Sequence, residues 1–205
     1  MIVRRFAVPV LAAMLVVAAC GKKQPPPPPA PTGPTPEELA QRRADSIAAA
    51  RRADSIAAAR REAEAKAAAA AARARAVAAA RTTLQEMVHF DFDKSDIRPD
   101  AEAILQRKVA ILRASPDVQL QIQGYCDERG SEEYNLALGQ RRAESVRKYL
   151  EGFGLSDSRF TIISYGEERP LDPAHNEDAW AQNRRDQFVI TAGANAINPP
   201  STSGN

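Results

Sequence analysis

The chain has 205 residues, and its charges nearly balance, with 28 Lys and Arg against 26 Asp and Glu and a formal net charge of +2. Nucleic-acid-binding proteins usually carry a clear basic excess, so this balance argues against that class. The sequence contains two cysteines, Cys20 and Cys126, which are too few for the disulfide framework of a small secreted domain.

The N-terminus predicts a secretory signal. Arg4 and Arg5 precede a short apolar run at residues 6–17, and the small residues Ala18 and Ala19 follow. The run is shorter than the roughly 20 apolar residues that span a bilayer, so a membrane-spanning helix is the weaker interpretation.

Residues 17–20, Val-Ala-Ala-Cys, resemble the lipobox of bacterial lipoproteins. In such proteins the cysteine is acylated and the preceding segment is removed, so residues 1–19 are the expected signal peptide and Cys20 the lipidated residue. Lipidation would leave Cys126 without a partner for an intrachain disulfide. Gly21 stands where lipoproteins retained at the inner membrane often carry Asp, which favours the outer membrane. An ordinary signal that happens to contain a cysteine is the alternative.

A long spacer is expected after the signal. Residues 20–36 are rich in proline, a composition that favours extended polyproline II and cannot build a core. Residues 37–83 are rich in Ala and Arg and contain neither Gly nor Pro. Thr35 suits a helix N-cap, Pro36 suits the first helical position, and Glu38 completes a capping box.

The spacer contains an internal repeat, because the unit RRADSIAAA occurs at 42–50 and again at 51–59. Nine residues make about 2.5 helical turns, so Ile47 and Ile56 face opposite sides and no heptad stripe forms. We therefore predict a solvated single helix, with a disordered alanine-rich segment as the alternative. Either form would act as a spacer between the membrane and a folded domain.

A folded domain is expected over residues 84–192, where aromatic, β-branched and Gly residues become frequent. Alternating apolar residues indicate strands, and apolar residues three and four apart indicate helices. The expected elements are strands at 87–92, 118–123, 160–165 and 187–191 and helices at 99–114, 136–153 and 177–181. This order predicts an α+β fold, a mixed sheet with helices packed on one face. Residues 193–205 are expected to be a disordered tail.

Four segments of the domain carry motifs in a fixed order: VHFDFDKSDIRPDA at 88–101, GYCDERGSEEYNLALGQRRAESVRKYL at 124–150, ISYGEERP at 163–170 and NRRDQFVI at 183–190. In order and spacing they resemble the C-terminal domain of outer-membrane protein A, and most closely the lipoprotein members of that family. The resemblance covers residues 84–192. It implies non-covalent binding of peptidoglycan through the meso-diaminopimelate of its stem peptide.

The resemblance also implies which side chains contact that ligand. Diaminopimelate ends in an ammonium and a carboxylate on one carbon, so a receptor needs an anion and a cation close together. Asp127 matches the anion, and Arg142, whose planar fork suits a carboxylate, matches the cation. Asp93, Asn135 and Phe92 match further ligand-contacting positions. No metal or other cofactor is implied.

The NRRD segment is interpreted differently. Asn183, Arg184 and Arg185 match the family but are expected to be mainly structural, bracing the last strand. Asp186 stands where relatives commonly have an apolar residue.

Catalysis is the competing function class, and Cys126 is its candidate nucleophile. A thiolate mechanism needs a base, but His89 and His175, the two histidines, lie on a strand and in an expected loop, and no triad or metal-ligand spacing is visible. We therefore expect no enzyme activity and a half-buried filler role for Cys126.

Two roles remain open for the whole chain. One is an outer-membrane component of a Tol system, lipid-anchored on the periplasmic face, that docks a periplasmic propeller protein and serves envelope integrity and cell division. The other is a plain wall anchor that links the outer membrane to peptidoglycan without Tol partners. Similarity to the lipoprotein subgroup favours the first.

Overall fold

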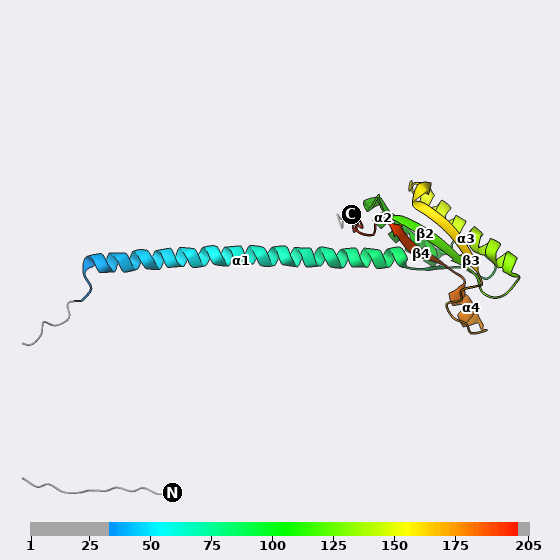
Figure 1. Ribbon diagram of the computed structural model, residues 1–205, viewed down its shortest axis with the longest axis horizontal. Coiled ribbons are helices and arrows are strands. Elements are labelled where there is room, and N and C mark those ends of the chain that lie inside the picture. The colour runs from blue at the N-terminus through cyan, green and yellow to red at the C-terminus, as the bar shows by residue number, and fades with distance from the viewer. Residues whose placement is uncertain (1–32, 201–205) are drawn as a thin grey trace, which may run out of the picture. The chain divides into compact units, whose positions relative to one another are not determined.

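The computed structural model describes residues 33–200 (Figure 1). The signal predicted at 1–19, the lipidation site Cys20 and most of the proline-rich linker lie outside the described residues. Among the helices that are described, none combines the length and apolar character needed to cross a membrane. The chain divides into two compact units, Met1–Ala57 and Ala58–Asn205, and helix α1 contributes to both.

Helix α1 spans Pro36–Gln85 and confirms the helical spacer over the disordered alternative. It begins at the predicted capping box: the backbone N–H of Thr35 donates to Glu38 Oε2 at 2.8 Å, and that of Glu38 donates to Thr35 Oγ1 at 3.3 Å. The helix is exposed over most of its length, and its two fully buried residues, Ala80 and Leu84, lie near its C-terminal end.

The sheet has four strands in the order β1-β4-β2-β3, formed by β1 (Val88–His89), β4 (Arg185–Ala192), β2 (Gln119–Tyr125) and β3 (Phe160–Gly166). Strand β2 is parallel to β3 and antiparallel to β4, and β1 is antiparallel to β4. The predicted mixed sheet is therefore confirmed.

Strand β1 is shorter than the predicted strand at 87–92. The backbone N–H of Phe90 still donates to Arg184 O at 3.0 Å, but a turn follows at once and the backbone of Asp93 is left-handed, with a φ of 54°. A non-Gly residue in this region is uncommon and often marks a functional loop. The turn carries Phe92 and Asp93 away from the sheet.

Helices α2 (Pro99–Ala114), α3 (Glu132–Gly152) and α4 (Glu177–Asn183) appear at the predicted places (Figure 1). Helix α3 begins at Ser131, whose hydroxyl accepts from Tyr134 N at 3.2 Å. The core lies between the sheet and helices α2 and α3, and its fully buried side chains include Phe90, Leu105, Leu112, Leu120, Ile122, Val146 and Leu150.

The core of the domain includes residues on both sides of the predicted range 84–192. The last turns of α1, with Ala80 and Leu84, belong to the same core as the sheet, so the domain begins before residue 84. The tail was expected to be disordered, but Ile197 is buried in that core and Asn198 N donates to Ser115 Oγ at 2.8 Å. Both segments pack because each supplies an apolar side chain that the core encloses.

The C-terminal end of α1 is closed by a buried ammonium group. Lys108 of α2 is fully buried, and its Nζ donates to the carbonyls of Thr83, Leu84 and Glu86 at 2.8, 2.9 and 2.6 Å. A cation at this position satisfies helix carbonyls that lack intrahelical partners. Burial lowers the pKa of Lys108 to about 7.

Candidate functional site

One cavity contains all five predicted ligand residues. Its volume is about 200 Å³, and it is lined by Phe92, Asp93, Cys126, Asp127, Arg129, Gly130, Tyr134, Asn135, Leu138 and Arg142. These residues come from the loop after β1, the loop between β2 and α3, and the first three turns of α3. The sequence predicted their grouping through family resemblance, and the structure brings them together.

Arg142 is completely buried. Its Nε donates to Lys94 O at 2.8 Å, Nη1 to Tyr125 O at 2.8 Å and to the Cys126 sulfur at 3.4 Å, and Nη2 to Asp91 O at 3.1 Å. A guanidinium has five N–H donors, so one remains beyond these four bonds.

Every partner of Arg142 within residues 33–200 is neutral, because its hydrogen bonds go to carbonyls and a thiol and it forms no salt bridge there. Burial lowers the pKa of Arg142. Arg142 lines the cavity as a buried cation without a carboxylate, an arrangement that is costly unless an anion approaches.

Asp127 lies in the same cavity but does not pair with Arg142. Its carboxylate accepts from Arg129 Nε at 3.2 Å and Nη2 at 2.7 Å, and from Arg184 Nη1 at 3.2 Å. Burial raises the pKa of Asp127, but the hydrogen bonds from Arg129 and Arg184 outweigh it, so the net pKa is lowered. The group is therefore a carboxylate at neutral pH.

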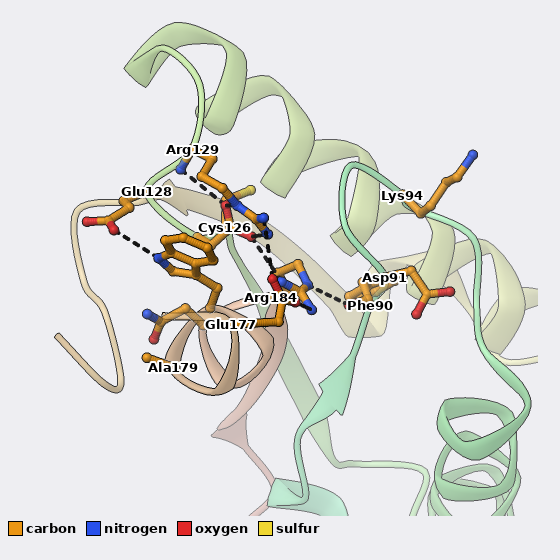
Figure 2. Close-up of polar contacts among 12 residues, drawn as sticks. Phe90, Asp91, Lys94, Cys126, Glu128, Arg129, Glu177, Ala179 and Arg184 are labelled. Atoms are coloured by element: carbon orange, nitrogen blue, oxygen red, sulfur yellow. Dashed lines mark hydrogen bonds and ion pairs between the residues drawn. The ribbon is translucent and has the colours of Figure 1, made fainter. Parts of the chain in front are cut away.

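Arg184 was expected to be structural, but its side chain reaches the site. Its Nη2 donates to Glu177 at 2.8 Å and its Nε to Phe90 O at 3.1 Å, beside the bond to Asp127. Figure 2 shows the side chains of Arg129 and Arg184 pointing toward one another. Asn183 and Arg185 do support the fold: Asn183 Oδ1 accepts from Leu171 N at 2.7 Å, and Arg185 stacks on Tyr125.

Arg129 was not singled out from the sequence. Its guanidinium carbon lies 3.9 Å from the centre of the Phe92 ring and 4.3 Å from that of Trp180, within cation–π range of both. Trp180 is itself oriented by Nε1, which donates to Glu128 at 2.8 Å. The charged DERG segment at 127–130, which contains Arg129, was visible in the sequence. No sequence pattern placed Trp180 beside it.

The other predicted residues have distinct roles. Asn135 is buried and its amide donates to the carbonyls of Asp127 and Arg129, both at 3.3 Å, so it holds the loop that carries them. Asp93 accepts a hydrogen bond from the Tyr134 hydroxyl. Phe92 is 53% exposed, so an aromatic face is available at the edge of the cavity.

Cys126 is buried rather than half-buried, and its thiol donates to Asn135 O at 3.3 Å. Burial raises the pKa of Cys126 to about 11, which opposes thiolate chemistry. His175 contacts Glu128 at the protein surface, at 2.7 Å. In the part of the chain that is described, no group of three His, Cys, Asp or Glu side chains could hold a metal ion.

Asp186, which stands where relatives commonly have an apolar residue, has an unusual position in the structure. It is completely buried on β4, and neither carboxylate oxygen has a hydrogen-bond partner within residues 33–200. Burial raises the pKa of Asp186 well above its ordinary value, although the charge of Arg142 opposes this. Within residues 33–200, no hydrogen bond or ion pair joins Asp186 to Arg142.

A mixed four-stranded sheet, with a cavity lined by charged side chains beside one end of α3, defines an α+β domain. Comparison with known proteins identifies its family. Residues 89–184 match the OmpA family. The peptidoglycan-associated lipoprotein of Haemophilus influenzae is 46% identical over 98 residues, 48% of this chain and 64% of that protein. The one of Pseudomonas aeruginosa is 43% identical over 97 residues, 47% of this chain and 57% of that protein.

A solved structure agrees. The peptidoglycan-associated lipoprotein of Burkholderia pseudomallei is 43% identical, with a TM-score of 0.50, over 52% of this chain and 90% of that one. The chain belongs to the OmpA family, as the motifs predicted. The matches cover less than two thirds of the two curated relatives' own length. The prediction that the chain is not an enzyme is consistent with this family.

Proposed function

We propose that the chain is an outer-membrane lipoprotein that binds peptidoglycan non-covalently and so links the outer membrane to the cell wall. The names of its relatives support the class, since they are peptidoglycan-associated lipoproteins. The lipobox supports anchoring through a lipid on Cys20. The domain would lie on the periplasmic face of that membrane, because the periplasm is the compartment that contains the wall.

The ligand group we propose is the zwitterionic end of meso-diaminopimelate. One observation carries this proposal: Arg142 is a fully buried cation at the cavity with no carboxylate partner among the described residues. An incoming carboxylate would supply the missing countercharge and could use the N–H that remains. Asp127 lines the same cavity and would receive the ammonium, while Phe92, Asp93 and Asn135 shape the walls.

Calorimetric titration of the purified full-length protein with a diaminopimelate-containing stem peptide tests the proposal. A Lys-type stem peptide is the matched control, because lysine has the ammonium but lacks the terminal carboxylate. We expect the Lys-type peptide to bind much more weakly. Equal binding of the two peptides would show that Arg142 does not read a carboxylate.

The likeness to these lipoproteins favours a role in a Tol–Pal system, with a periplasmic Tol propeller protein as partner, over a plain wall anchor. A pull-down from periplasmic extract, with and without soluble stem peptide, separates the two roles. Recovery of a propeller protein supports the first, and recovery of wall fragments alone supports the second.

A further inference from the structure

The acceptor positions of Asp127 are already used in the structure. Oδ1 accepts from the backbone N–H and the Nε of Arg129 at 3.1 and 3.2 Å, and Oδ2 accepts from Arg129 Nη2 at 2.7 Å and Arg184 Nη1 at 3.2 Å. A carboxylate has about four lone-pair sites. The side chain is also only 4% exposed. A ligand ammonium therefore cannot bond to Asp127 unless one of the protein's own donors leaves.

The two arginines differ in how firmly they are held. The Arg184 side chain is 8% exposed and is fixed by Phe90 O at 3.1 Å and Glu177 at 2.8 Å. The Arg129 side chain is 30% exposed, and its ion pair with Glu177 is longer, at 3.4 Å. Arg129 is therefore the donor that can move without opening the core.

The surroundings of Arg129 form a site for a cation. Its guanidinium carbon lies 3.9 and 4.3 Å from the ring centres of Phe92 and Trp180, and the guanidinium donates to the Asp127 carboxylate. Aromatic faces and a carboxylate attract any compact cation, including an alkylammonium. Replacing Arg129 with a ligand ammonium exchanges one cation for another, so Asp127 never becomes an unpaired buried charge.

We propose that Arg129 occupies the ammonium subsite of the cavity in the ligand-free protein and that the ammonium of the ligand displaces it. This inference rests on the proposed function. It adds that an internal competitor, Arg129, closes the site. The measured affinity is therefore the intrinsic affinity multiplied by the fraction of molecules in which Arg129 has left Asp127. The two charges of diaminopimelate then have different access: Arg142 is ready for the carboxylate, whereas Asp127 must first be released.

The direct test is nitrogen-15 NMR of arginine side chains in the full-length protein. The Nε–H resonance of Arg129 is assigned by its absence in Arg129→Lys. In the free protein it should be protected from solvent exchange by Asp127. At saturation with the diaminopimelate stem peptide it should broaden or shift to a solvent-exposed position, while the Nε–H of Arg184, bonded to Phe90 O, stays protected.

Affinity provides the second readout. Arg129→Ala removes the competitor, so it should bind the stem peptide about tenfold more tightly than wild type, while Arg129→Lys keeps a cation and should gain less. Loss of affinity in Arg129→Ala would make Arg129 a ligand contact and overturn the displacement. Binding by wild type with the Arg129 resonance unchanged would overturn it as well and leave the proposed function standing. Absence of binding by both wild type and Arg129→Ala would overturn both proposals.

Discussion

Gly139 of helix α3 lies directly against Gly124 of strand β2, so closely that a Cβ on Gly124 would overlap the carbonyl of Gly139. The absence of both side chains lets the helix approach the sheet. Arg142 follows Gly139 by three residues, about one turn of helix. This contact therefore sets the depth at which the Arg142 guanidinium meets the carbonyl of Tyr125, at 2.8 Å.

Gly124→Ala should destabilise the domain and weaken stem-peptide binding together, because the added methyl group pushes α3 away. Overpacking of this kind typically costs about 1–3 kcal/mol. Gly152→Ala is the matched control, since a Cβ there meets nothing and Ala is favoured in helices by up to about 1 kcal/mol. Urea unfolding measures the stability of both variants. If Gly124→Ala matched wild type in stability, the close approach would not be what positions α3.

Much of this arrangement follows from sequence pattern. The helices at 99–114 and 177–181 and the strand at 160–165 were predicted at or close to their observed positions, because apolar spacing and Gly or Pro boundaries act locally. Strand 87–92 was predicted too long because its phenylalanines alternate, but only residues 88–89 find partners on β4. Pairing depends on a strand almost a hundred residues away, which periodicity does not report.

The site was predictable in part. Asp127, Arg142, Asp93, Asn135 and Phe92 were named through family resemblance, and all of them line one cavity. Sequence could not show that Arg129 already covers Asp127, because that contact depends on the conformation of the loop that carries both residues. Nor could it show that Arg142 lacks an anion, because its partners include residues up to 51 positions away in the chain. The same limit applied to Lys108 and Asp186: each lies within an otherwise ordinary helix or strand pattern, and nothing local indicates complete burial.

Lys108 should give stability a measurable pH dependence. Its pKa is about 7 in the folded protein against 10.5 ordinarily, so between these values the unfolded chain binds more protons. Stability should therefore rise as the pH increases from about 7. Lys108→Met should not show this rise in stability with pH. It also loses the hydrogen bonds to the carbonyls of Thr83, Leu84 and Glu86. Urea unfolding between pH 6 and 8.5 tests this, and an identical slope in the variant would assign the rise to another group.

Asp186→Val should stabilise the domain. The wild-type carboxyl is buried without hydrogen bonds, and removing such a group typically gains about 1–3 kcal/mol. The raised pKa means that the folded protein holds this proton more tightly than the unfolded chain, so wild-type stability should fall as the pH rises above about 4. Valine should remove that decline. Asp186→Asn, which keeps an unpaired polar group, should stabilise less. Thermal unfolding at pH 4 and 7 distinguishes these outcomes.

Cys20→Ala should abolish lipidation, because the thiol is the proposed attachment point. The variant should be released from the outer membrane, since the proposed lipid chain holds the protein there. Metabolic labelling with a fatty acid, followed by membrane fractionation, measures both effects. Labelling of Cys20→Ala as strong as that of wild type would place the lipid elsewhere. Cys126→Ala is the control and should be labelled normally, because that thiol is buried.

The proposed recognition mechanism depends most on Arg142 and Asp127. Arg142→Lys keeps the charge, but its three donors cannot replace the four bonds of Arg142 and also reach a ligand. Asp127→Asn keeps the shape but not the charge. Asp127→Asn should lower affinity for the diaminopimelate stem peptide by about 2–5 kcal/mol, the usual loss when one partner of a desolvated charge pair is removed. That loss corresponds to a factor of roughly 30 to several thousand. Arg142→Lys should also lower the affinity, because an ammonium does not reproduce the geometry of a guanidinium. Arg141→Ala, one residue along the same helix and exposed, should bind like wild type.

Stability must be measured alongside affinity in these variants. Arg142 holds the carbonyls of Lys94, Tyr125 and Asp91, so its loss leaves buried acceptors unpaired and destabilises the fold as well. The decisive comparison is therefore between ligands within one folded variant. Arg142→Lys should reduce binding of the diaminopimelate peptide strongly and that of the Lys-type peptide little, because only the first carries the carboxylate. Equal reduction for both peptides would mean that Arg142 supports the cavity without reading that carboxylate.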